Sequence, residues 1–189
     1  MEKLVALPAR RRALAGLALF SLTGLSGVRA QTAKAPARTP DVMRHEWRTF
    51  LPAGATVPEP KPPLTLSKDE WKKRLTPAQY KVLREEGTEP AGSSALDREK
   101  RRGVFACAGC GLPVFTSEMK YDSGTGWPSF FTTIPGAFNT KQDYYLVLPR
   151  TEYHCMRCGG HHGHVFDDGP LPTRQRWCNN GLALTFLPA

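Results

Sequence analysis

From Gly103 onward, short apolar runs alternate with turn residues along the chain. The runs are rich in Val, Phe, Tyr and Leu, and Gly, Pro or Asp residues separate them. They read GVFACA, PVF, DYYLVLP, EYHCM, HVFDDG and LALTFLP. Runs of this length with no helical stretch between them are typical of antiparallel sheets. The pattern therefore predicts a mainly β domain.

Two short helices are predicted before this region. SKDE at 67–70 has the pattern of a capping box, in which a Ser and a Glu three residues later satisfy the free amides of a helix start. TPAQ at 76–79 repeats the pattern with proline at the first helical position, and Gly87 is placed to end the second helix. These signals predict helices over 68–75 and 77–86.

The N-terminal residues have the pattern of an export signal. Three consecutive arginines at 10–12 precede an apolar run at 13–27, and VRA at 28–30 offers the small residues that signal peptidases prefer. The alternative is a membrane anchor, but a span needs about 20 apolar residues. Gly, Thr and Ser dilute the run, which favours the twin-arginine route. We therefore expect a signal peptide at 1–30, export to a bacterial periplasm and no stable membrane anchor.

Residues 31–63 have the composition of a proline-rich linker. Within this segment, residues 47–51 are apolar enough to dock on a folded domain. The folded domain is expected at 64–189. Most of the formal net charge of +9 lies outside this domain, because 65–189 carry 16 Lys/Arg against 13 Asp/Glu. A domain of net charge +3 without a basic stripe argues against nucleic-acid binding.

Four of the five cysteines form two Cys-x-x-Cys pairs, CAGC at 107–110 and CMRC at 155–158. Tetrahedral zinc takes four such thiolates, and the glycines within or directly after the pairs (Gly109, Gly111, Gly159 and Gly160) allow the tight turns of a zinc knuckle. The alternative is a pair of disulfides, which an oxidising compartment would favour. A four-thiolate site has no open position, so its metal would be structural. The predicted ligands of one Zn²⁺ are Cys107, Cys110, Cys155 and Cys158.

The fifth cysteine, Cys178, lies in the polar sequence RQRWCNNG. Alternate side chains of an extended segment share a face, so Arg176 and Asn180 are expected beside Cys178. A guanidinium next to a thiol favours the thiolate, and we therefore expect a lowered pKa and a reactive thiol. A buried structural cysteine is the alternative.

Four of the five histidines fall in HCMRCGGHHGHVFDDGP at 154–170. A histidine beside a reactive cysteine transfers protons near neutral pH, and Asp167 or Asp168 is available to orient it. The spacing does not decide which histidine acts. The sequence SGTGWPSF at 123–130 presents Trp127 at a turn, unless Trp127 is a core residue.

CAGC, YDSGTGWPSF, CMRC, HHGHVFDDGP, RWCNNG and LTF, in this order, closely resemble the B-type methionine-R-sulfoxide reductases. The helical opening WKKRLTPAQYKVLREEGTE resembles the start of that family, and the likeness covers 64–187. It implies an enzyme that reduces the R epimer of methionine sulfoxide in proteins. It also implies a β-tent of two antiparallel sheets, with short N-terminal helices and one structural zinc.

The resemblance implies a role for each matching residue. Cys178 would be the nucleophile that attacks the sulfoxide sulfur and becomes a sulfenic acid, and Trp127 would contact the S-methyl group. His161 and His164 would line the pocket, with His164 the candidate that protonates the sulfoxide oxygen. The residues that would tune the histidine and the thiolate are Asp168, Arg176 and Asn180.

The chain departs from the family pattern at Thr125, where many members have a resolving cysteine. Because the other cysteines are assigned to zinc, we predict that an external thiol, such as a thioredoxin-like protein, regenerates Cys178. Smaller departures are Gly160, His162 and Trp177. The expected partners are oxidised proteins and the thiol reductant, and a monomer suffices. The competing hypotheses are a non-catalytic zinc-ribbon binding module and a Cys-x-x-Cys thiol–disulfide exchanger.

Overall fold

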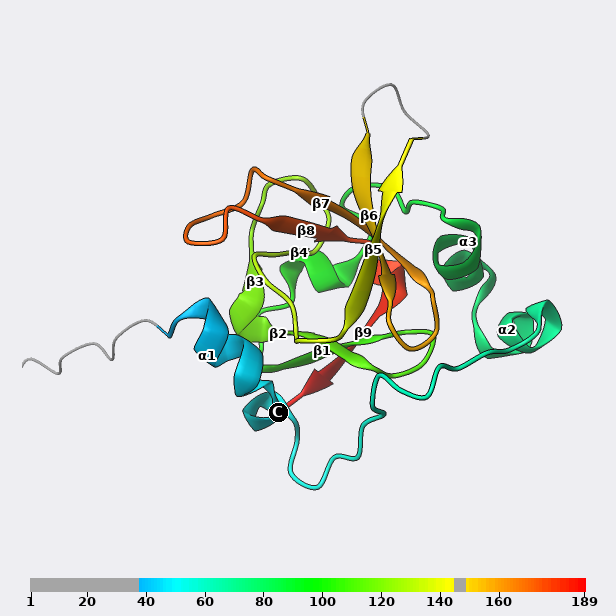
Figure 1. Ribbon diagram of the computed structural model, residues 1–189, viewed down its shortest axis with the longest axis horizontal. Coiled ribbons are helices and arrows are strands. Elements are labelled where there is room, and N and C mark those ends of the chain that lie inside the picture. Colours follow the sequence, from blue (N-terminus) through cyan, green and yellow to red (C-terminus); the bar gives the residue numbers. More distant parts are fainter. Residues whose placement is uncertain (1–37, 145–148) are drawn as a thin grey trace, which may run out of the picture. The chain divides into compact units, whose positions relative to one another are not determined.

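The computed structural model describes residues 38–144 and 149–189, and its strands form two antiparallel sheets (Figure 1). The three-stranded sheet has the order β2-β1-β9 and the larger sheet the order β3-β4-β8-β7-β6-β5. The smaller sheet contains β1 (Gly103–Cys107), β2 (Pro113–Thr116) and β9 (Leu184–Pro188). The larger contains β3 (Lys120–Tyr121), β4 (Ser129–Phe130), β5 (Phe138–Asp143), β6 (Arg150–Cys155), β7 (His161–Phe166) and β8 (Arg176–Asn179). The predicted mainly β fold of two antiparallel sheets is confirmed.

A seam of aromatic side chains joins the two sheets. Phe105 of β1, Phe115 of β2 and Phe130 of β4 are fully buried. The rings of Phe115 and Phe130 stack with their centroids 3.8 Å apart, and the ring of Phe105 meets that of Phe130 edge-on at 5.1 Å. Burial of such large apolar rings is the main source of stability in a core of this size. The core therefore lies between the sheets.

Both predicted helices are present, as α2 (Lys68–Arg74) and α3 (Pro77–Glu85), and each begins with the expected capping box. The end of α3 differs in detail from the prediction. The left-handed residue is Glu86, with φ of 53°. Gly87 follows, and its N–H donates to the Lys81 carbonyl at 3.0 Å. A Cβ at position 87 would lie 2.9 Å from that carbonyl oxygen, so the turn requires the glycine.

Part of the expected linker is folded. It contains α1 (Pro40–His45) and the 3₁₀ helix η1 (Trp47–Phe50). Phe50 is buried beneath the guanidinium of Arg102, whose carbon lies 3.7 Å from the ring centroid. Arg102 also donates to the Thr49 carbonyl at 2.9 Å. A cation–π contact and a hydrogen bond thus hold this segment against β1. The remaining 3₁₀ helices are η2 (Ala95–Arg98), η3 (Ser117–Met119) and η4 (Gly181–Ala183).

The expected signal peptide at 1–30 lies outside the described residues. Among 38–144 and 149–189, no helix has the length and apolar character that crossing a membrane requires.

Candidate active site and metal centre

The four paired cysteines lie together at the ends of the two sheets. Cys107 ends β1 and Cys110 lies in the turn before β2, while Cys155 ends β6 and Cys158 lies in the turn before β7. In each turn a glycine N–H donates to the first cysteine's carbonyl at 2.8 Å, from Gly111 to Cys107 and from Gly159 to Cys155. Both glycines have left-handed φ, of 74° and 67°. These are the tight turns that the sequence predicts.

The sulfur positions fit a single metal ion. All four Sγ atoms lie within 4.8 Å of one another, and the residues are buried. The Sγ atoms of Cys107 and Cys158 are 3.6 Å apart, and those of Cys110 and Cys155 are 3.5 Å apart. A tetrahedral ion with metal–sulfur bonds of about 2.3 Å places its ligands about 3.8 Å apart. A disulfide needs about 2.05 Å, so the cluster has the dimensions of a metal site.

Cys178 lies in the middle of the larger sheet. It sits on β8, opposite Ser129 of β4 and His164 of β7. Its half-buried side chain lines a cleft of about 150 Å³. The other residues that line the cleft are Thr88, Trp127, Arg150, Gly163, His164, Phe166, Asn179 and Asn180. A Cβ at Gly163 would lie 2.0 Å from the Cys178 carbonyl oxygen, so glycine is what lets β7 approach β8 here.

The net effect of the surroundings on the pKa of Cys178 is opposite to the expectation. Burial raises the pKa of Cys178, and this exceeds the lowering by the Arg176 charge and by hydrogen bonds from Arg176 and Thr125. The predicted lowering is therefore wrong as a net effect, although Arg176 acts in the expected direction. Asp168 holds Arg176 in place, because it accepts from Nε at 2.7 Å and from Nη2 at 2.9 Å.

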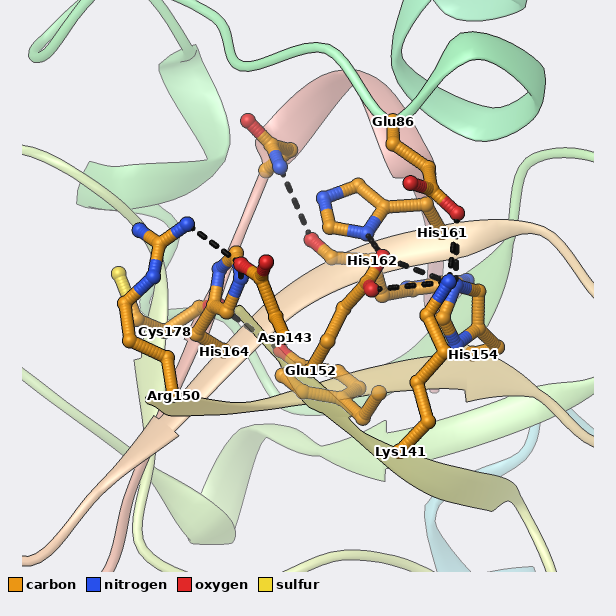
Figure 2. Close-up of polar contacts among 12 residues, drawn as sticks. Glu86, Lys141, Asp143, Arg150, Glu152, His154, His161, His162, His164 and Cys178 are labelled. Atoms are coloured by element: carbon orange, nitrogen blue, oxygen red, sulfur yellow. Dashed lines mark hydrogen bonds and ion pairs between the residues drawn. The ribbon is translucent and has the colours of Figure 1, made fainter. Parts of the chain in front are cut away.

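His164 is oriented by an aspartate that the sequence analysis did not single out. Its Nε2 lies 2.8 Å from Asp143 Oδ2, the oxygen that also accepts from Arg150 Nη2 at 2.6 Å (Figure 2). Asp143 and Arg150 face each other across the β5–β6 pair. The sequence signal for this ion pair was the presence of opposite charges seven residues apart, on either side of the apolar YYLVLP. In the structure Asp168 contacts Arg176 and Asp143 contacts His164.

His161 lies next to His164 but outside the cleft that holds Cys178. The two ring centroids are 5.7 Å apart. The His161 side chain is buried, its Nδ1 contacts Glu152 Oε1, and its Nε2 has no hydrogen-bond partner. Both histidines line a larger cavity of about 480 Å³ beside the cleft. Of the two histidines expected in the pocket, only His164 lines the cleft around Cys178.

Glu89 is a second residue that the sequence analysis missed, and it holds the other wall of the cleft. Its carbonyl accepts from Trp127 Nε1 at 3.1 Å, and its N–H donates to Asn180 Oδ1 at 3.0 Å. Its buried carboxylate accepts from the N–H groups of Gly181 and Leu182 at 2.6 and 2.8 Å. Glu89 therefore fixes Trp127 and Asn180 relative to the end of β8.

Comparison with known proteins shows the family to which the chain belongs. A SelR domain model matches residues 75–188. The peptide methionine sulfoxide reductase MsrB of Leptospira interrogans is 47% identical over 121 residues, which are 64% of this chain and 92% of that protein. The chain belongs to the B-type methionine-R-sulfoxide reductases. The MsrB of Methanosarcina barkeri is 50% identical over 121 residues, 64% of this chain and 85% of its own length. The mitochondrial methionine-R-sulfoxide reductase B3 of Mus musculus is 43% identical over 140 residues, 74% of this chain and 55% of its own length.

Three of the positions at which the sequence departs from the pattern expected from the resemblance lie outside the cleft lining. His162 is fully buried, its Nδ1 lies 3.0 Å from Asn179 Oδ1, and burial lowers its pKa to about 3. It is therefore a neutral core residue. A Cβ at Gly160 would lie 2.9 Å from a terminal methyl carbon of Leu83 on α3, so a larger residue there would have to displace that methyl group. Trp177 packs edge-on against the Tyr153 ring at 5.0 Å.

Proposed function

We propose that this chain reduces methionine-R-sulfoxide residues in oxidised proteins to methionine, with Cys178 as the nucleophile. The observation that carries the proposal is the cleft in which the Cys178 thiol, His164 and Trp127 meet. A thiol supplies the nucleophile, a histidine supplies a proton, and an aromatic ring favours contact with a thioether or its methyl group. Membership of the reductase family supports the same reaction.

The proposed reaction has two stages, reduction of the sulfoxide by Cys178 and regeneration of Cys178 by external thiols. The Cys178 thiolate attacks the sulfoxide sulfur while His164 holds and protonates the oxygen. The hydroxyl then passes to the Cys178 sulfur as two bonds to the methionine sulfur break, the one to the oxygen and the transient one to Cys178. The methionine sulfur keeps an electron pair, which leaves methionine and a cysteine sulfenic acid. An external thiol then forms a mixed disulfide with Cys178 and releases water. A second thiol frees Cys178 and leaves the reductant as a disulfide.

The need for an external thiol follows from where the other cysteines are. All four lie in the buried cluster, and position 125, which contacts the Cys178 thiol, is a threonine. Thr125 has no thiol with which to attack the sulfenic acid. We propose that the cluster holds zinc, which four thiolates suit, and that the ion is structural because four ligands leave no open position.

The function is tested with a peptide that carries separated R and S epimers of methionine sulfoxide, with dithiothreitol as the reductant. We expect consumption of the R epimer alone, as monitored by chromatography. When the reductant is omitted, we expect a sulfenic acid at Cys178 that a dimedone probe traps. Turnover of neither epimer by metal-loaded protein, or of the S epimer alone, would contradict the proposal.

Asp143 is expected to act as a positioning residue for His164. Asp143→Asn removes the negative charge that His164 and Arg150 share and leaves one neutral amide oxygen as the acceptor. We expect kcat to fall about tenfold or more, with a smaller change in KM, because proton transfer to the oxygen is impaired. Steady-state kinetics measures this split. Asp69→Asn, in the exposed first turn of α2, is the control. An unchanged kcat would remove Asp143 from the mechanism.

We also propose export to the periplasm, which rests on the basic, apolar and small-residue pattern of 1–30. The twin-arginine route would let the domain load its metal and fold before crossing. Replacing Arg11 and Arg12 by lysine is expected to leave the protein in the cytoplasm of the producing bacterium. Cell fractionation measures this, and unchanged recovery from the periplasm would exclude the twin-arginine route.

A further inference from the structure

A second group of metal-ligating side chains lies outside the cysteine cluster. Glu152 and His154 project from β6, and His161 projects from the neighbouring β7, where it pairs with His154 across the strands. One ligand atom from each lies within 4.8 Å of the others. Figure 2 shows Glu152 and His154 close together beside Lys141, with Cys178 on the other side of the view. We propose that these three residues bind one divalent transition-metal ion, such as Zn²⁺ or Co²⁺.

The geometry supports coordination of an ion. Glu152 Oε1 contacts His161 Nδ1 and lies 2.9 Å from His154 Nε2, so one carboxylate oxygen faces two imidazole nitrogens. Ligands about 2.1 Å from a tetrahedral ion lie about 3.4 Å apart, so a shift of about 1 Å or less opens the group around a metal. Two imidazoles and one carboxylate form a donor set that binds zinc with an open position for water.

The charges around the group favour a divalent cation. Glu152 and Glu86 are the two carboxylates, and Glu86 Oε1 lies 3.7 Å from His154 Nε2, where it is a candidate fourth ligand. The Lys141 ammonium lies 2.7 Å from Glu86 Oε1 and 3.1 Å from Glu152 Oε2. Glu152 Oε1 therefore stays available to the ion. One ammonium offsets only one of the two carboxylates.

A cavity gives the ion a route to the group. It has a volume of about 450 Å³, and its lining includes His154, His161, Glu86 and Lys141. Arg84 also lines it, but its guanidinium donates to the Cys158 carbonyl at 2.8 Å and lies over the Trp71 ring. Lys141 is thus the cation of this cavity that competes with a metal, and its half-exposed side chain would turn to solvent when an ion replaces it beside the two carboxylates.

The test is calorimetric titration of untagged protein, already loaded with one zinc, with Co²⁺ and in parallel with Zn²⁺. We expect a second equivalent to bind, and His154→Ala to weaken that equivalent about tenfold or more, since removal of even an indirect ligand contact costs this much. Glu152→Gln is expected to weaken it as well. Lys141→Ala is expected to tighten it, because the competing ammonium is gone. The gain in affinity keeps the proposal testable if the buried substitutions disturb the fold.

Two controls separate this site from other metal ligands in the chain. His45→Ala removes a histidine on the distant helix α1 and is expected to leave the second equivalent unchanged. Cys178→Ser removes the thiol of the catalytic cleft and is also expected to leave it unchanged. Binding of only one equivalent in total would overturn the proposal. A second equivalent that disappears in Cys178→Ser, or that ignores His154→Ala and Lys141→Ala alike, would place the ion elsewhere and overturn it too.

Discussion

Replacing Cys178 by serine is expected to abolish methionine sulfoxide reduction, with a loss of at least about a thousandfold in kcat/KM. The reaction needs a nucleophile that accepts the oxygen and returns to its starting state through thiol exchange, and a hydroxyl does neither. Serine is close to cysteine in size and keeps the contacts of residue 178 with Arg176 and Thr125. The loss would therefore be chemical and not structural.

The expected loss of kcat/KM in Cys178→Ser does not depend on a thiol that is already ionised in the resting protein. Its pKa is raised by burial, so the thiolate fraction at neutral pH is below that of an exposed cysteine and grows as the pH rises through the folded pKa. The Arg176 guanidinium, held by Asp168, limits how far burial raises the pKa of Cys178. The reactivity of the site therefore depends on proton transfer to the sulfoxide oxygen as well as on the thiolate.

The measurement is the rate of R-epimer consumption, with the thermal midpoint and the zinc content as checks of folding. Trp177→Tyr is the matched control, because residue 177 lies next to Cys178 but its side chain packs on Tyr153 and does not line the cleft. We expect near-normal activity in Trp177→Tyr. Retained turnover in Cys178→Ser would mean that another group attacks the sulfoxide.

The features that the sequence predicts well are set by residues close together in the chain. Each capping box joins residues three apart, so the starts of α2 and α3 follow from local hydrogen bonding. The same holds for the cysteine turns, in which Gly111 and Gly159 adopt the left-handed φ that the tight bend needs. The family resemblance, which rests on motifs in a fixed order, predicted that Cys178, His164 and Trp127 lie in one pocket.

The features that the sequence does not predict depend on distant parts of the chain. Asp143 meets His164 only because β5, β6 and β7 pair in one particular register. The carboxylate of Glu89 reaches amides 92 and 93 residues further along the chain. The raised pKa of Cys178 reflects burial by several elements, whereas the neighbouring Arg176 alone suggested the opposite direction. Net burial is a property of the packed fold and not of a local pattern.

Loss of one ligand from the cysteine cluster is expected to have the largest effect on stability. Cys107 and Cys110 lie at the end of β1 and in the turn to β2 of the smaller sheet, whereas Cys155 and Cys158 lie at the end of β6 and in the turn to β7 of the larger one. A bound ion would therefore cross-link the two sheets. Structural zinc supplies about 10 kcal/mol or more of binding energy in small domains, against a total stability of about 5–15 kcal/mol. In Cys158→Ser a bound ion would have only three cysteine ligands and a buried hydroxyl beside it.

We therefore expect Cys158→Ser to lose about 5 kcal/mol of unfolding free energy, which corresponds to roughly 10–20 °C in the thermal midpoint for a domain of this size. Calorimetry and metal analysis of the purified protein measure the two effects together. Cys178→Ser is the matched control, because it removes a thiol outside the cluster and should keep both its metal and its midpoint. A Cys158→Ser protein with one equivalent of zinc and an unchanged midpoint would show that the cluster does not join the sheets. If the midpoint fell equally in both variants, the loss would reflect the removal of a thiol and not of a metal ligand.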